Sequence, residues 1–109
     1  MRTYYCQRIN GDAYCNVHDE AHGTICIHPL RNRLDLANHS PDGFEWGYGG
    51  SGPAQLALSL LADALQDDQR ALSLYQRFKW KWIVNRPRSD WTITQDELIK
   101  AAEEIEVEH

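Results

Sequence analysis

The sequence predicts an α+β fold in which an N-terminal antiparallel sheet of about three strands packs on three helices. An Asn-Gly turn between two β-prone runs near the N-terminus indicates a hairpin. An almost wholly apolar run over about 53–66 indicates a central helix. With 109 residues, 42% of them apolar and 25% charged, the chain has enough material for one core, so we expect residues 1–109 to form a single domain.

The strands are expected in the first third of the chain. The runs Thr3–Ile9 and Ala13–Val17 flank a turn at 10–12 and form the predicted hairpin. After a polar stretch over His18–Gly23, the β-branched run Thr24–His28 predicts a third short strand, which ends because a proline follows.

The first helix is predicted over about 53–66, after an irregular polar connection that covers Arg31–Ser40. Pro53 fixes the backbone of its first turn. Its polar side chains fall on one narrow stripe at helical spacing, so every other position requires cover from the rest of the domain. The stripe consists of Gln55, Ser59, Asp63 and Gln66.

Two more helices follow. Asp67 and Asp68 provide an N-cap and favourable charge for the second helix, and Asn85-Arg86-Pro87 ends it. A turn through Ser89–Trp91 leads to Thr94-Gln95-Asp96-Glu97, a capping box that predicts the start of the third helix. The expected inward faces comprise Ala71, Tyr75, Phe78 and Trp82 in the second helix, and Leu98, Ala101, Ala102 and Ile105 in the third.

A glycine-dense aromatic loop before the first helix is the candidate ligand-binding site. Its G-x-G-x-x-G spacing at a helix start presents backbone N–H groups and a positive dipole end to an anion. A small anionic ligand would contact Glu45, Trp46, Gly47, Tyr48, Gly49, Gly50, Ser51 and Gly52. In the structural alternative, the glycines let the loop pass tightly over neighbouring side chains, Ser51 caps the helix, and Phe44, Trp46 and Tyr48 line the core.

Defined catalytic motifs do not fit this loop. A dinucleotide fold requires a βαβ unit, and a P-loop requires Lys-Ser or Lys-Thr after the glycines. The nucleophile-elbow pattern is not completed after Ser51. An enzyme would have to draw on Glu45, Asp42 and Ser51 with a distant histidine such as His39. We therefore assign no catalytic residue and expect no cofactor.

Cysteines and histidines gather after the predicted hairpin. Cys15, His18, His22 and Cys26 supply four groups that can bind zinc, in a spacing that matches no standard zinc finger. The structural alternative places the cysteines in the sheet as small apolar side chains and the histidines in a solvent-exposed loop. Three cysteines without a secretory signal indicate reduced thiols and a cytoplasmic location.

A basic aromatic segment over Arg77–Arg88 is the candidate partner-binding site. Phe78 and Trp82 belong to the expected core face, so Trp80 is left for the surface. An exposed tryptophan flanked by lysines is typical of a protein-binding hot spot. The candidate residues are Lys79, Trp80, Lys81, Arg86 and Arg88. The same composition suits nucleic acid, which ranks behind a protein partner.

The overall charge and hydropathy limit the partners further. A formal net charge of −5 at pH 7 gives no overall attraction to nucleic acid or anionic lipid. The longest apolar stretch is interrupted by Ser59 and Asp63, so we expect no membrane association. These properties leave the oligomeric state open.

The block Pro41–Leu58, which reads PDGFEWGYGGSGPAQLAL, resembles the hallmark of DUF6166, a family of short bacterial and phage proteins of unknown function. The segments Tyr75–Lys79 and Trp91–Thr94 are similar to later parts of that family, so the resemblance extends over most of the chain. The four zinc-competent residues lie outside the block. The resemblance implies a gene carried by a phage or mobile element, where short proteins often bind and block host machinery.

Together these observations predict a small cytoplasmic binding module. It would act on a host macromolecule through the Trp80 region, or bind a small anion at the glycine turn. The alternative is a nucleotide-binding protein or an enzyme that uses the same turn.

Overall fold

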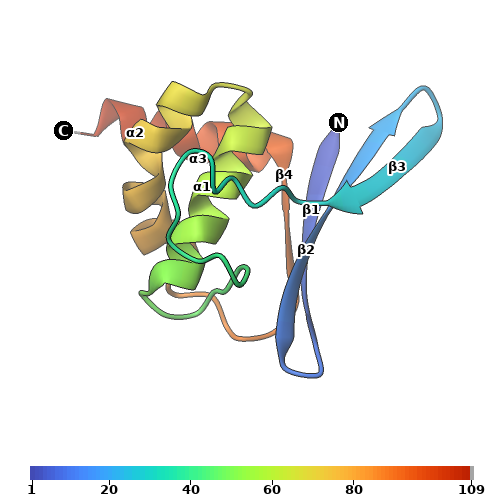
Figure 1. The fold of residues 1–109 in the computed structure, drawn as a ribbon. Coiled ribbons are helices and arrows are strands. Elements are labelled where there is room, and N and C mark those ends of the chain that lie inside the picture. Colours follow the sequence, from blue (N-terminus) through green and yellow to red (C-terminus); the bar gives the residue numbers. More distant parts are fainter. Residues whose placement is uncertain (109) are drawn as a thin grey trace.

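The computed structural model describes residues 1–108 and confirms the α+β fold. Figure 1 shows an antiparallel sheet with the helices gathered on one side of it. In chain order the elements are β1 (Arg2–Ile9), β2 (Asp12–Ala21), β3 (Thr24–Pro29), α1 (Ser51–Leu65), α2 (Asp68–Phe78), the short π-helical turn η1 (Lys79–Ile83), β4 (Trp91–Thr94) and α3 (Gln95–Val107). The first helix is central, as the sequence predicts, since α1 contacts α2, η1 and α3.

The sheet has the order β3-β2-β1-β4, and each neighbouring pair is antiparallel. Asn10 and Gly11 have φ angles of 52° and 87°, as a two-residue hairpin turn requires. His22 and Gly23 form a second such turn, with φ angles of 54° and 76°. β2 continues to Ala21, so most of the polar stretch that follows the predicted hairpin is strand rather than loop.

The strand β4 is the one element of the sheet that the sequence does not predict. It lies at the edge opposite β3, where Trp91 pairs with Cys6 and Thr94 with Thr3. The sequence indicates a turn at Trp91, whereas the structure begins a strand there. Four residues carry too little periodicity to be recognised, and their extended conformation is fixed by pairing with β1.

The helix α1 is buried around almost its whole circumference, and the polar side chain of Gln55 is fully buried with it. Gln55 Oε1 accepts hydrogen bonds from the backbone N–H groups of His39 at 2.8 Å and Ser40 at 3.1 Å. Its Nε2 donates to the carbonyl of Ala37 at 3.0 Å. One glutamine therefore fixes three backbone groups of the polar connection.

The next two residues of the polar stripe also hold other segments. Ser59 is fully buried, and its Oγ accepts from the backbone N–H of Arg33 at 3.3 Å. Asp63 Oδ1 accepts from the Tyr4 hydroxyl at 2.5 Å and from the Arg2 guanidinium at 2.7 Å. The stripe is thus a row of internal hydrogen-bonding groups that joins α1 to β1 and to the connection.

Both later helices begin with the caps that the sequence predicts. Asp67 Oδ1 accepts from the backbone N–H of Arg70 at 3.1 Å. Thr94 Oγ1 accepts from the N–H of Glu97, whose carboxylate accepts from the N–H of Thr94, both at 3.1 Å. This reciprocal pair is the predicted capping box. The four apolar residues expected on the inward face of α3 are all buried.

The end of α2 differs from the expected regular helix. The N–H of Val84 donates to the carbonyl of Lys79 at 3.0 Å, the i to i+5 bond of a π-helical turn. The wider turn changes which side chains point inward. Lys79 and Ile83 are buried, whereas Trp82, expected inward, is half-buried.

Candidate functional site

The glycine-dense loop is tightly packed at its glycines, against other segments at Gly47 and Gly49 and against residues of the loop itself at Gly50 and Gly52. At Gly47, whose φ is 90°, an added Cβ would lie 2.9 Å from the carbonyl oxygen of Arg86 and from the side chain of Arg88. The N–H of Gly47 donates to the Ile83 carbonyl at 3.1 Å. At Gly52 a Cβ would lie 2.7 Å from Cβ of Glu45. Close approach by neighbouring groups therefore accounts for these glycines.

The three aromatic residues of the loop take different positions. Trp46 is fully buried, and Phe44 is half-buried against the core. Tyr48 is 41% exposed, so the expectation that all three line the core is wrong for this residue. It emerges on the surface because the loop has left the extended conformation that alternation requires, with φ of 90° at Gly47.

The buried indole of Trp46 is held by residues from two strands. The Arg8 guanidinium lies 4.6 Å from its ring centroid, and the Trp91 ring meets it edge-on at 6.1 Å. Its Nε1 donates to the carbonyl of Ser89 at 3.1 Å. Trp46 is therefore a structural anchor for the loop rather than a surface available to a ligand.

Glu45 pairs with Arg8, a residue that sequence reasoning does not connect to the loop. The Arg8 guanidinium donates to both oxygens of the Glu45 carboxylate, at 2.8 and 3.1 Å. These hydrogen bonds lower the pKa of Glu45, against the opposing effect of burial. Arg88 lies further away, with Nη2 at 3.9 Å from the same carboxylate. No local sequence pattern around Arg8 predicts this pair, because β1 and the loop come together only in the folded chain.

The start of α1 differs from an open anion site. Gly50 is the N-cap, no side chain caps the helix, and Ser51 is exposed, so the expected cap at Ser51 is wrong. Glu45 packs against Gly52 in the first turn. The space beside Cα of Gly52 is therefore filled by Cβ and Cγ of Glu45 rather than left open to a ligand.

The glycine loop and the basic aromatic segment meet at Gly49 and Trp80. A Cβ at Gly49 would lie 2.7 Å from Cη2 and 3.0 Å from Cζ3 of the Trp80 indole. Trp80 is 58% exposed. The Arg88 guanidinium lies 5.1 Å from the ring centroid of Tyr48, beside this contact. We call Tyr48, Gly49, Trp80 and Arg88 the Trp80 surface.

The predicted basic residues contribute unequally to this surface. Lys79 is only 8% exposed, and its Nζ lies 4.6 Å from the centroid of the Trp80 ring. Arg86 is half-buried, with its guanidinium 4.2 Å from the Trp91 centroid. Lys81 and Arg88 are exposed, although Lys81 also pairs with Glu108. Lys79 and Arg86 thus support aromatic rings, while Lys81 and Arg88 reach solvent.

The groups that an enzyme would use are engaged with other residues. His39 Nε2 lies 2.7 Å from the Tyr75 hydroxyl, while Glu45 is paired with Arg8. Asp42 and Glu45 line a cavity of about 360 Å³ with residues of β2, and Ser51 is not part of its lining. These contacts give no arrangement of nucleophile and base.

The four zinc-competent residues are separated. Cys15 is buried with its Sγ 3.2 Å from that of Cys6. His18 lies on the opposite face of β2, His22 lies in the following turn, and Cys26 is exposed on β3. Within residues 1–108, no three His, Cys, Asp or Glu side chains are placed to hold a metal ion.

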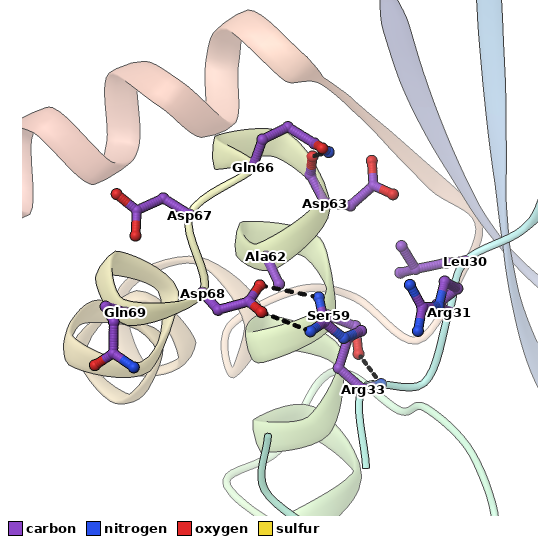
Figure 2. Close-up of a pocket in the computed structure, with 10 residues that line it drawn as sticks. All are labelled: Leu30, Arg31, Arg33, Ser59, Ala62, Asp63, Gln66, Asp67, Asp68 and Gln69. Atoms are coloured by element: carbon purple, nitrogen blue, oxygen red, sulfur yellow. Dashed lines mark hydrogen bonds and ion pairs between the residues drawn. The ribbon is translucent and has the colours of Figure 1, made fainter. Parts of the chain in front are cut away.

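Figure 2 shows a polar cavity of about 330 Å³ between the polar connection, α1 and the start of α2. Arg33 crosses it and donates to the two carboxylate oxygens of Asp68 at 2.8 and 3.1 Å. Arg33 also pairs with Asp35, and its hydrogen bonds lower the pKa of both carboxyl groups. The charges of Arg33 and Asp68 in this cavity already pair with each other. We therefore interpret the cavity as a structural link between the polar connection and α2.

A comparison with protein families places this geometry in context. The model described as "Family of unknown function (DUF6166)" matches residues 4–104. The chain belongs to the DUF6166 family. The DUF6166 match includes the glycine loop and the whole Trp80 surface. No curated protein and no solved structure matches the chain. Among the described residues, no helix combines the length and apolar character needed to cross a membrane.

Proposed function

We propose that this chain is a small binding module that engages a host macromolecule, specifically a protein, through the Trp80 surface. The observation that supports it is the contact between Trp80 and Gly49, where an added Cβ would lie 2.7 Å from the indole. A glycine at this position leaves room for an indole that remains 58% exposed. Tryptophan, tyrosine and arginine are the residues most often found at protein-binding hot spots, and all three occur here.

The position of the indole favours binding over a merely solvated side chain. The Lys79 ammonium lies 4.6 Å from the Trp80 centroid on a side chain that is itself buried. Gly49 supports the far edge of the ring. A ring held from two sides loses little conformational entropy when a partner covers it, which favours affinity.

The charge of the surface specifies the partner further. Arg88 is exposed there, on a chain whose formal net charge is −5, whereas the ammonium of Lys81 is paired with Glu108. A partner that presents carboxylates around an apolar pocket would match this local positive charge and accept the indole. If the gene is carried by a phage or mobile element, as the DUF6166 resemblance implies, that partner belongs to the bacterial host.

The experiment is affinity capture from a bacterial lysate by the wild-type chain, by Trp80→Ala and by the control Leu34→Ala. Leu34 is an exposed apolar residue of the polar connection, outside the Trp80 surface. We expect a defined protein to be retained by the wild type and by Leu34→Ala and lost by Trp80→Ala. Equal retention by all three chains would contradict the proposal.

A second measurement separates the alternatives. The NMR signals of the backbone amides are recorded while the protein is titrated with inorganic phosphate and, separately, with a single-stranded oligothymidylate. A small-anion site predicts phosphate-induced shifts at Ser51 and Gly52, at the start of α1. A nucleic-acid surface predicts salt-sensitive shifts around Trp80 with the oligonucleotide. Protein binding at the Trp80 surface predicts neither response at physiological salt.

A further inference from the structure

The strand β3 forms an exposed edge of the sheet. It is the last strand in the order β3-β2-β1-β4, and no described strand pairs with its outer side. Figure 1 shows the β2–β3 hairpin extending away from the helices, so neither side of its far end is covered by them. Thr24 to Ile27 are all exposed. An edge of this kind can pair with another strand.

The backbone groups that face outward can be identified. The N–H of Leu30 donates to the carbonyl of Cys15 at 2.9 Å, which continues the pairing of β3 with β2. In an antiparallel pair, alternate residues exchange hydrogen bonds with the neighbour. Cys26, four residues before Leu30, therefore bonds toward β2. The N–H and C=O groups of Ile25 and Ile27 point to the outer edge.

The middle of this edge carries two exposed isoleucines, with Thr24, Cys26 and His28 at the alternate positions. Ile25 and Ile27 are 59% and 60% exposed. They pair with Glu20 and His18 of β2, so they lie on the open face of the sheet. Edge strands are commonly protected by lysine, by proline or by a bulge. β3 contains no charged residue, and its one proline, Pro29, is the last residue of the strand, beyond Ile25 and Ile27, which leaves this part of the edge open to association.

We propose that two copies of this chain associate through β3, with the strands antiparallel and Cys26 on the two-fold axis. In this register Ile25 faces Ile27 of the partner subunit, and Ile27 faces the partner's Ile25. The order Ile-Cys-Ile reads the same in both directions, so the pattern is self-complementary. The outward N–H and C=O groups then form hydrogen-bonded pairs, and four isoleucines gather on one face.

The symmetry of the pairing fits the arrangement of the layers. Antiparallel pairing of two copies of β3 places the two-fold axis perpendicular to the sheet, which keeps the helices of both copies on the same side and makes the interface isologous. The acidic residues Asp19 and Glu20 belong to β2, one strand further in. Three strand spacings of about 4.8 Å separate the two β2 strands by about 14 Å. That separation exceeds the screening length of about 8 Å at physiological salt, so repulsion between these acids is weak.

The first test is sedimentation velocity over a wide range of protein concentration in reducing buffer. We expect a concentration-dependent dimer for the wild type. Ile27→Lys places a charge in the centre of the edge and should give a folded monomer with unchanged circular dichroism. The control is Ile9→Lys, the same change at a residue that is 52% exposed on β1, and it should remain a dimer.

Two outcomes of this test would overturn the proposal. One is a wild-type chain that stays monomeric at every concentration. In that case β3 does not pair with a second copy, and an extended segment of another protein would be the remaining candidate for this edge. The other is a dimer that persists in Ile27→Lys, which would place the contact elsewhere. Because Ile9→Lys has the same charge change, a general effect of net charge is distinguished from loss of the strand pairing.

Cross-linking tests the register. Residues that face each other in a non-hydrogen-bonded antiparallel pair have Cα atoms about 4.5 Å apart, within reach of a disulfide. Among the described cysteines Cys26 is exposed, whereas Cys6 and Cys15 are buried. Oxidised glutathione should therefore give a covalent wild-type dimer, and Cys26→Ser should give none. An equal yield from Ile27→Lys, or no covalent product from a chain that sediments as a dimer, would contradict this register.

Discussion

The indole of Trp80 lies against Gly49, at the point where the glycine loop meets the turn after α2. Two segments that the sequence presents as separate candidate sites are therefore parts of one surface. The glycines let Arg88 and Trp80 approach the loop closely and let Glu45, within the loop, pack against the first turn of α1. This packing connects an unusual composition to an exposed aromatic side chain without requiring a bound anion.

Gly49→Ala tests this contact. The new Cβ would lie 2.7 Å from Cη2 of Trp80, so the indole must move. We expect the Nε1–H resonance of Trp80 to shift clearly. The free energy of unfolding should change by less than about 1 kcal/mol, because Trp80 is mostly exposed. In a Trp80→Ala background the same change at Gly49 should have almost no effect. A Trp80 resonance unchanged by Gly49→Ala would contradict the contact.

Gln55→Leu tests the polar stripe of α1. It preserves the approximate side-chain volume but removes the partner of three backbone groups, in Ala37, His39 and Ser40. Because these three backbone groups would lose their hydrogen-bond partner, we expect a loss of about 2–3 kcal/mol in the free energy of unfolding. Gln76→Leu, at an exposed position of α2, is the matched control and should stay within about 0.5 kcal/mol. Chemical denaturation of both variants provides the comparison, and equal stability would contradict the role of Gln55.

Glu45→Gln tests the pair with Arg8 and its dependence on pH. Hydrogen bonding to Arg8 lowers the pKa of Glu45 in the folded protein. Its stabilisation is therefore present above the unfolded pKa of about 4.3 and is lost as the pH falls through the lower folded pKa. Because solvent partly screens the pair, we expect Glu45→Gln to cost about 1 kcal/mol at pH 7.

The dependence of the melting temperature on pH tests whether the ion pair is the cause of this stabilisation. The difference in melting temperature between wild type and Glu45→Gln should shrink as the pH falls below the unfolded pKa and through the lower folded pKa, because Glu45 becomes protonated first in the unfolded chain and then in the folded chain. Glu103→Gln, at an exposed position of α3, should show no comparable difference. A constant difference at all pH values would mean that the ion pair is not its cause. An enzyme would instead show lost turnover with unchanged stability.

Thr94→Ala tests the capping box that begins α3. Thr94 Oγ1 accepts from the N–H of Glu97, and alanine removes this acceptor. The expected cost is about 1 kcal/mol in the free energy of unfolding. Thr94→Asp keeps an acceptor at the same position and should restore most of the stability. If thermal unfolding gives the same midpoint for Thr94→Ala and the wild type, the cap contributes nothing.

The features that the sequence predicts are those with a local cause. The hairpin is predicted because Asn10 and Gly11 readily adopt the left-handed backbone conformation of its turn. The capping box is predicted because Thr94 and Glu97 are three residues apart. The surface position of Trp80 is also predicted, because Phe78 occupies the core face. Each signal is contained within a few consecutive residues, so no knowledge of the rest of the fold is needed.

The features that the sequence does not predict depend on distant partners. β4 is extended because it pairs with β1, and Glu45 is ordered by Arg8 from the first strand. Lys79 is expected at the surface from a regular helical period, but the π-helical turn rotates it inward. The contact between Gly49 and Trp80 is likewise absent from any local pattern. The candidate site was therefore predicted in two pieces, and only the fold joins them.

Calorimetric titration of the captured partner against the wild type, Trp80→Ala and Leu34→Ala decides whether the Trp80 surface is the binding site. A hot-spot tryptophan is worth at least about 2 kcal/mol, so Trp80→Ala should weaken binding by about 30-fold or more. Leu34→Ala should bind as the wild type does. Equal affinity for all three chains would contradict the assignment of the Trp80 surface as the binding site.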